Sequence, residues 1–151
     1  ALTFYSGFDI TIKAIGDIEI DDHHTVEDVG ILLGVAFKEA LGDKVGIYRF
    51  SSNFTPMDEA LTRVVLDISN RPKLVYNVNY KREQIGLLSL ENVKEFLYAF
   101  AIESRITLHI ESLYGDNDHH IFESIFKGLG RALKESCLIS SNKVSSTKGV
   151  L

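Results

Sequence analysis

The sequence predicts an α+β fold made of two tandem, pseudo-symmetric repeats, each with strands on one side and helices on the other. The chain lies on itself when it is shifted by 96 positions, and residues 21–27 then fall on residues 117–123. In each copy this cluster follows an alternating, β-rich stretch and precedes apolar residues at helical spacing. Two predicted strands and a helix precede the second copy, and the first copy has no counterpart to them. We therefore expect the front part of the first repeat to be missing.

Both repeats belong to a single predicted domain, because a chain of 151 residues can bury one sizeable core. The partial first repeat covers about residues 1–54, and the second repeat covers about residues 55–140. Residues 141–151 form a polar tail, which is predicted either to be disordered or to fold over a ligand.

The first repeat is predicted to contain a strand, a long helix and a second strand. Residues 8–15 alternate between apolar and polar side chains, which is typical of a strand. Asp22 is a suitable N-cap for a helix that continues to about Leu41, where Gly42 ends it. Residues 45–50 are rich in β-forming side chains and predict the next strand.

The second repeat is predicted to contain three strands and two helices. Ser89 is the expected cap of a helix that continues to about Glu103, and Asp118 is the expected cap of a helix that ends near Glu135. Strands are expected at 61–68, 74–78 and 105–113, with loops at 55–59 and 79–86.

Composition excludes several classes of protein. The net charge of -5 argues against non-specific binding of nucleic acid, although a local basic patch could still hold a phosphorylated metabolite. The sequence has no apolar run long enough to span a bilayer, so no membrane partner is expected. The single cysteine, Cys137, rules out an internal disulfide and fits a reducing compartment such as the cytoplasm.

Four of the five histidines lie in the two repeated clusters, next to carboxylates. His23 and Glu27 are four residues apart on one helix face, a spacing that lets both side chains grip one ion. His24 points about 100° away around the helix, so it is expected to reach a different ion. We therefore predict two metal ions with crossed ligation, and His109 would complete one of the two sites. The clusters read Asp21-Asp22-His23-His24-Thr25-Val26-Glu27 and Asn117-Asp118-His119-His120-Ile121-Phe122-Glu123.

A single histidine near a helix start is usually a cap or a surface group. Two copies at the same helical position favour metal binding over this alternative. Nitrogen and oxygen ligands without thiolate suit manganese, iron, cobalt or zinc, and the spacing does not choose among these metals.

Further motifs accompany the clusters, and together they span nearly the whole chain. With them the chain resembles the imidazoleglycerol-phosphate dehydratases of histidine biosynthesis. The stretches that carry the resemblance are 16–30, Pro56-Met57-Asp58-Glu59-Ala60, Leu66-Asp67-Ile68-Ser69, Arg71-Pro72, Thr107-Leu108-His109-Ile110, Asp118-His119-His120, Phe126-Lys127 and Ser146-Thr147-Lys148-Gly149.

The resemblance implies the ribosomal protein S5 domain 2-like fold and two Mn²⁺ ions per active site. It also implies trimers that build a 24-subunit homo-oligomer with active sites at subunit interfaces. The metal ligands it implies are His23, His24, Glu27, His109, His119, His120 and Glu123. The substrate contacts it implies are Arg49, Arg71, Lys127, Ser146 and Lys148, which would make 141–151 a substrate-binding tail.

The chain departs from the family at several points. Members carry an amino-terminal segment with a further metal-binding histidine and a catalytic glutamate, for which this sequence has no counterpart. Tyr5 stands where many members have histidine, and Asn70 stands where glycine is usual. We therefore keep Glu27 and Glu123 as the candidate catalytic carboxylates within the chain, and assign Asp58 a polar role. If Glu27 and Glu123 both stay on metal, the base is instead the glutamate of that amino-terminal segment.

The predicted reaction removes water from imidazoleglycerol phosphate to give imidazoleacetol phosphate, which makes the enzyme a carbon–oxygen lyase. Metal binding to the imidazole favours an imidazolate whose electrons can expel the neighbouring hydroxyl. A carboxylate then takes a proton, and the enol becomes a ketone. Two alternatives remain open: a dinuclear metallohydrolase, and a non-catalytic metal-binding or assembly form of the same protein.

Overall fold

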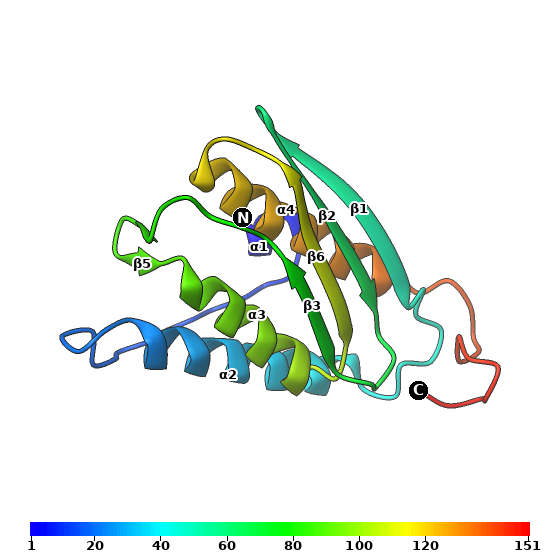
Figure 1. Cartoon of the computed structure of the whole chain (residues 1–151). Coiled ribbons are helices and arrows are strands. Elements are labelled where there is room, and N and C mark those ends of the chain that lie inside the picture. The colour runs from blue at the N-terminus through cyan, green and yellow to red at the C-terminus, as the bar shows by residue number, and fades with distance from the viewer.

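A computed structural model describes the whole chain, residues 1–151, and shows an α+β fold (Figure 1). Ten elements follow one another: α1 (Leu2–Ser6), α2 (His23–Leu41), β1 (Phe50–Met57), β2 (Ala60–Asp67), β3 (Lys73–Asn77), β4 (Gln84–Ile85), β5 (Leu88–Ser89), α3 (Glu91–Glu103), β6 (Thr107–Tyr114) and α4 (Asp118–Ser136). No helix combines the length and the apolar composition that crossing a membrane would need.

Four strands form the main sheet, in the order β1-β2-β6-β3. The β1–β2 and β2–β6 pairs are antiparallel, whereas β3 pairs with β6 in parallel. Helices α3 and α4 pack on one face of this sheet, and α2 packs against α3 (Figure 1). The opposite face of the sheet has no helix on it.

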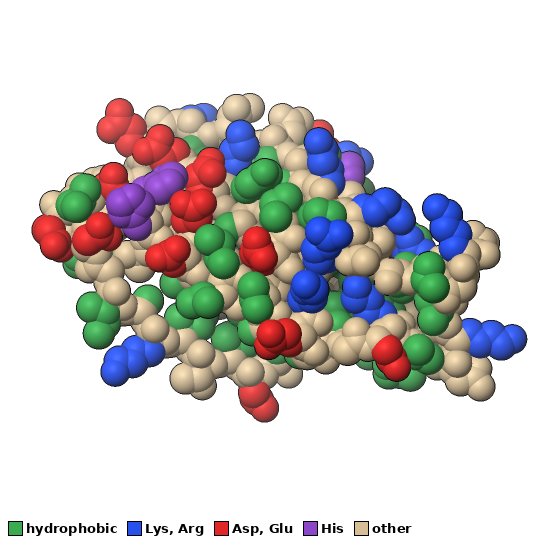
Figure 2. Space-filling model, turned by 90° about the horizontal axis from the view of Figure 1, so that it is seen from below, with side chains coloured by type: hydrophobic (Ala, Val, Ile, Leu, Met, Phe, Trp, Pro, Cys, Tyr) green, Lys and Arg blue, Asp and Glu red, His purple; other side chains and the backbone are tan.

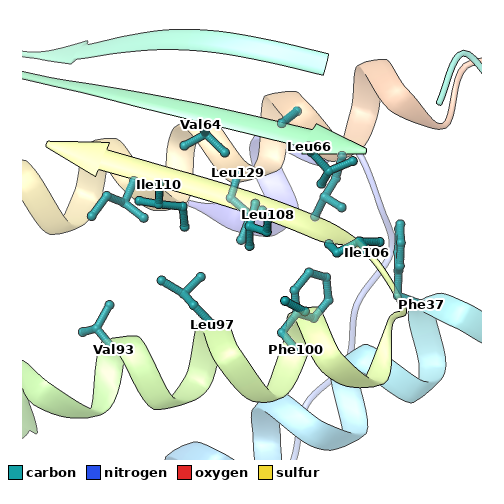
Figure 3. Packing of buried hydrophobic residues seen from close by; sticks show 14 of the residues in the cluster. Phe37, Val64, Leu66, Val93, Leu97, Phe100, Ile106, Leu108, Ile110 and Leu129 are labelled. Carbon is teal, nitrogen blue, oxygen red and sulfur yellow. The ribbon is translucent and has the colours of Figure 1, made fainter. Parts of the chain in front are cut away.

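The core lies between the sheet and the two helices that cover it (Figure 3). Side chains alternate along a strand, so Val64 and Leu66 of β2 point into the core, whereas the neighbouring Arg63 is exposed on the other face. Leu97 of α3 and Leu129 of α4 meet them and are fully buried. Each such leucine stabilises the fold by about 1.5–3 kcal/mol relative to an exposed one.

The structure supports the internal repeat at the level of individual contacts. A Cβ at Gly34 of α2 would lie 2.8 Å from the Phe100 carbonyl oxygen of α3. A Cβ at Gly130 of α4 would lie 2.8 Å from the Leu2 carbonyl oxygen of α1. Both glycines thus allow close helix contact, so α1 packs on α4 as the last turn of α3 packs on α2.

The residues that follow these two helices also correspond. Ser6 and Ser104 are both buried, and each donates a hydrogen bond to a carbonyl oxygen of its own helix. Gly7 and Arg105 come next, and both have a left-handed φ, of 71° and 61°. These pairs are 98 positions apart rather than 96, so the repeats differ by two residues before the histidine clusters.

The predicted strand at residues 8–15 is wrong. This segment runs extended beside α2 but forms no ladder. Its counterpart in the second repeat is β6, which has β2 and β3 as hydrogen-bonded neighbours. Residues 8–15 have no strand beside them to pair with. A strand needs hydrogen-bonding partners, so β propensity alone did not produce one. Phe8 and Ile10 instead line an apolar groove on α2.

The next predicted strand and loop are also misplaced. Residues 45–49 make only one isolated bridge, from Ile47 to Ile139, because Gly46 and Arg49 have left-handed φ values of 79° and 78°. The strand begins at Phe50 and continues through most of the predicted loop at 55–59. The remaining strands, at 61–68, 74–78 and 105–113, are confirmed to within two residues.

Both long helices are confirmed. Asp22 is the N-cap residue of α2, as predicted, whereas the N-cap of α4 is Asn117, one residue before the predicted Asp118. Asn117 caps α4 by accepting a hydrogen bond from the His119 N–H at 2.9 Å. Asp21 accepts the same bond from the His23 N–H of α2, also at 2.9 Å. This frees Asp22 and Asp118 for other partners. The predicted cap Ser89 lies in β5 instead, and donates to Asp22.

Candidate functional site

The two histidine clusters open α2 and α4, and Figure 1 shows both helices beginning at the same end of the molecule. In the first cluster His23 Nε2 lies 3.6 Å from Glu27 Oε2. In the second cluster His119 Nε2 lies 3.3 Å from Glu123 Oε2. The predicted pairing of each histidine with the glutamate one turn later is therefore confirmed in both copies.

The neighbouring histidine rings also repeat their geometry. The His23 and His24 rings are 6.1 Å apart at 77°, and the His119 and His120 rings are 6.3 Å apart at 74°. Each His–His pair thus presents two ring nitrogens in different directions, as expected if they serve two ions.

The distance within the second His–Glu pair fits one divalent ion between the two side chains, and the distance within the first pair is slightly longer. Nitrogen and oxygen ligands lie about 2.1 Å from such an ion, so two of them at ordinary coordination angles are roughly 3.0–3.4 Å apart. The separation in the His119–Glu123 pair falls within this span, and that in the His23–Glu27 pair lies just outside it.

Three of the four cluster histidines also have an oxygen acceptor at Nδ1. His24 Nδ1 lies 3.0 Å from Asp17 Oδ2, and His120 Nδ1 lies 2.7 Å from Glu59 Oε2. His23 Nδ1 lies 3.0 Å from Asn92 Oδ1. Histidines that bind metals through Nε2 usually donate Nδ1–H to such an acceptor. Asp17 is seven residues from His24, whereas Glu59 and Asn92 are 61 and 69 residues from their histidines. None of these three side chains was assigned to the site from the sequence.

The hydrogen bonds shift the pKa values of these carboxyl and imidazole groups. His120 and the Asn117 N–H lower the pKa of Glu59 to about 2. Asp17 raises the pKa of His24, through its hydrogen bond and its charge. Burial opposes ionisation of Asp22, yet hydrogen bonds from Ser89 outweigh it and lower the pKa of Asp22.

Lys127, predicted to bind phosphate, lies with the second cluster. Its Nζ is 2.9 Å from Glu123 Oε1, and this contact lowers the pKa of Glu123. Lys127 Nζ also lies 3.0 Å from Met57 Sδ, close to Asp58. Asp58 Oδ2 is 3.6 Å from His120 Nε2, so Asp58 belongs to this cluster as well. The first cluster has no such lysine, because Ile31 stands at the corresponding position.

His109 lies away from both clusters within one chain. It stands in the middle of β6, level with Val65 of β2 and Val75 of β3. Its neighbours Leu108 and Ile110 point into the core, so His109 is exposed on the sheet face that carries no helix. A single chain arranges no group of three or more histidine, cysteine or acidic side chains that could hold a metal ion.

The other predicted substrate contacts gather around Asp67. Arg49 Nε lies 2.7 Å from Asp67 Oδ1, and Arg71 Nη2 lies 3.5 Å from Asp67 Oδ2. Arg49 also donates to the Ser145 carbonyl oxygen at 2.6 Å, which holds the tail against the sheet. The predicted residues Ser146 and Lys148 follow directly, and the Lys148 N–H donates to Ser146 Oγ.

The basic group and the second histidine cluster lie at opposite ends of α4. The Arg49 N–H donates to the carbonyl oxygen of Ser136, the last residue of α4. The 17 positions from His119 to Ser136 span roughly 25 Å at about 1.5 Å per residue. Figure 2 shows the face seen from below: histidine side chains lie among carboxylates toward one end, lysine and arginine side chains gather toward the other, and a further histidine side chain lies beside them.

Comparison with known proteins decides what this arrangement belongs to. The family model for imidazoleglycerol-phosphate dehydratase matches residues 1–133. An imidazoleglycerol-phosphate dehydratase of Clostridioides difficile is 55% identical over 150 residues, which cover 99% of this chain and 78% of that protein. The chain belongs to the imidazoleglycerol-phosphate dehydratase family. A dehydratase of Rhodopseudomonas palustris is 52% identical, with the same coverage of both chains.

Two solved structures of the family share the fold. The imidazoleglycerol-phosphate dehydratase of Staphylococcus aureus superposes with a TM-score of 0.86 at 41% identity, covering 92% of this chain and 78% of that one. The dehydratase of Pyrococcus furiosus gives a TM-score of 0.81 at 39% identity, covering 99% of this chain and 81% of that one. The predicted family and the α+β fold are thus confirmed.

Proposed function

We propose that this member of the dehydratase family removes water from imidazoleglycerol phosphate to form imidazoleacetol phosphate, a step of histidine biosynthesis, and that it needs two Mn²⁺ ions per active site. The single observation that carries the metal requirement is the repeated His–Glu pair, 3.6 Å and 3.3 Å across, at the start of two equivalent helices. The matching carboxylate partners of His24 and His120 support it.

The residues that would hold the metals are His23, His24, Glu27, His119, His120 and Glu123, with His109 contributed from another chain. When bound, divalent ions supply positive charge that favours loss of a proton from the imidazole ring of the substrate. Asp17 and Glu59 orient His24 and His120 through Nδ1, which keeps their Nε2 atoms available.

The carboxylates and the basic group would divide the remaining tasks. Glu27 and Glu123 would be the carboxylates within the chain that accept the proton that leaves carbon, and Asp58 stands beside His120 as a further polar group. The expelled hydroxyl and the proton lost from the imidazole nitrogen leave together as water. The proton that the carboxylate takes from carbon returns to the ring nitrogen, and the resulting enol becomes the ketone. Arg49, Arg71, Ser146 and Lys148 would hold the phosphate and so fix the position of the diol.

We further propose that each active site forms between chains. The three-carbon chain that separates imidazole from phosphate in the substrate is far shorter than the roughly 25 Å between the histidine and arginine groups of one chain. The exposed position of His109, away from both clusters, supports the same arrangement. Trimers that assemble into a 24-subunit homo-oligomer would bring the histidine end of one chain to the basic end of another.

A cytoplasmic location also belongs to this proposal. Cys137 is a free thiol, and burial raises its pKa to about 11. A protein that leaves its only thiol unpaired suits a reducing compartment.

Metal removal tests the proposed chemistry. The assembled protein is dialysed against a chelator, and formation of the ketone from imidazoleglycerol phosphate is then measured. We expect nearly all activity to disappear and to return when Mn²⁺ is added, with about two ions bound per chain by elemental analysis. Undiminished turnover in metal-free protein would refute the metal requirement. Release of inorganic phosphate in place of ketone formation would instead support the metallohydrolase.

A further inference from the structure

Asn92 is a buried amide next to the first histidine cluster. It lies in the first turn of α3 and is only 2 % exposed. Its side chain contacts two consecutive residues at the start of α2, the N-cap residue Asp22 and the first helical residue His23. Asn92 Nδ2 lies 2.9 Å from Asp22 Oδ1, and Asn92 Oδ1 lies 3.0 Å from His23 Nδ1.

The carboxylate of Asp22 fixes which way this amide points. Asp22 accepts hydrogen bonds from the Ser89 N–H at 2.8 Å and from Ser89 Oγ at 2.7 Å. A carboxylate that accepts from Ser89 needs a donor from Asn92, and only the NH₂ group of an amide donates. The carbonyl oxygen of Asn92 must therefore face His23.

The orientation of the amide in turn selects the proton position on His23. An amide oxygen only accepts, so His23 Nδ1 must carry the hydrogen that bridges the 3.0 Å contact. The neutral ring then has its lone pair on Nε2, the atom that lies 3.6 Å from Glu27 Oε2. One buried amide thus links the capping region of α2 to the ligand atom of His23.

We propose that Asn92 is a positioning residue that holds the His23 ring in the Nδ1–H tautomer and directs its Nε2 lone pair toward the space beside Glu27. His24 and His120 obtain the same tautomer from carboxylates, whereas His23 obtains it from an uncharged amide. The uncharged amide of Asn92 orients His23 without adding a negative charge next to it. The inference rests on the proposed metal-holding role of His23.

His119 provides a comparison within the same molecule. It pairs with Glu123 as His23 pairs with Glu27, but no hydrogen-bond acceptor of this chain lies at its Nδ1. The tautomer of His119 should therefore be insensitive to changes at Asn92.

Nitrogen-detected NMR of the metal-free protein, with histidine labelled with ¹⁵N, tests the tautomer directly. In the unmodified protein the His23 signals should be those of an Nδ1–H ring, and in Asn92→Leu they should shift toward the Nε2–H form, with His119 unchanged. Binding of Mn²⁺ alone should weaken by roughly 10- to 100-fold in the variant, the range for loss of an outer partner of a metal ligand. An Nε2–H ring at His23 in the unmodified protein would overturn the proposal.

An exchange of the two polar groups separates tautomer control from simple packing. In Asn92→Asp two carboxylates face each other, and Mn²⁺ binding should fall. The double variant Asp22→Asn with Asn92→Asp restores a donor–acceptor pair and still presents an oxygen to His23 Nδ1, so the tautomer and Mn²⁺ binding should recover. A double variant that folds but recovers neither the Nδ1–H tautomer of His23 nor Mn²⁺ binding would contradict the proposal. Because the tautomer is read without metal, loss of the metal requirement would leave this result standing.

Discussion

Replacing Glu123 with glutamine is expected to lower kcat by about 10²- to 10⁴-fold, the range for loss of a catalytic carboxylate. The substitution keeps the size of the side chain but removes the negative charge that Glu123 directs at His119 and Lys127. Loss of its partly buried ion pair with Lys127 should change the stability of the protein little, because ion pairs near the surface contribute little. Activity should therefore fall while the melting temperature hardly changes.

Glu135→Gln is the matched control for this variant. Glu135 lies on the same helix, α4, and accepts a hydrogen bond from Ser51 Oγ at 2.6 Å. It stands at the end of α4 that is remote from the histidine cluster. Steady-state kinetics should show wild-type turnover for Glu135→Gln. Equal losses in both variants would mean that the effect reflects the helix as a whole rather than the cluster.

Replacing Arg49 with glutamine is expected to lower kcat/KM by about 10- to 150-fold, mainly through KM. A charged hydrogen bond is worth about 1.5–3 kcal/mol, which corresponds to that factor. Arg49 is the most constrained member of the basic group, because Asp67 holds its Nε and Ser145 accepts from its Nη1. Its loss would remove a phosphate contact and also release the tail. Arg49→Lys keeps the positive charge but lacks the planar guanidinium that can donate two parallel hydrogen bonds, so its kcat/KM should fall less.

Arg105→Gln is the control for the basic group. Arg105 is a nearby exposed arginine whose guanidinium bonds only to Asn70, and neither residue is a proposed substrate contact. Kinetics at varied substrate concentration should leave Arg105→Gln close to wild type. A KM that is unchanged in Arg49→Gln would remove Arg49 from the phosphate site.

The sequence predicted best the elements whose signal is contained in their own residues. Helices α2 and α4 carry apolar residues at helical spacing, and this pattern can be recognised within each segment alone. The segment 8–15 has an equally good strand pattern, but a ladder depends on neighbours that local residues do not specify. The left-handed φ of Arg49, which displaced the start of β1, is likewise set by contacts with the tail and Asp67 rather than by residue type.

The candidate site was predictable to a similar extent. Repetition identified the two His–Glu pairs, because each pair lies within one turn of one helix. Asn92 was missed, since it comes 69 positions after His23 and only the packing of α3 on α2 brings it there. Lys127 was assigned to the substrate through the family resemblance, which does not indicate its partners within one chain, and here it meets Glu123.

The most direct test of the proposed composite site is to combine two inactive variants in one assembly. Glu123→Gln and Arg49→Gln chains are co-expressed with different tags, and assemblies that carry both tags are purified and assayed. If the histidine end of one chain and the basic end of another form each site, random mixing gives intact sites at about a quarter of positions, and activity should recover to about a quarter of wild type. Activity no higher than that of the parent variants, in assemblies shown to contain both chains, would contradict the account.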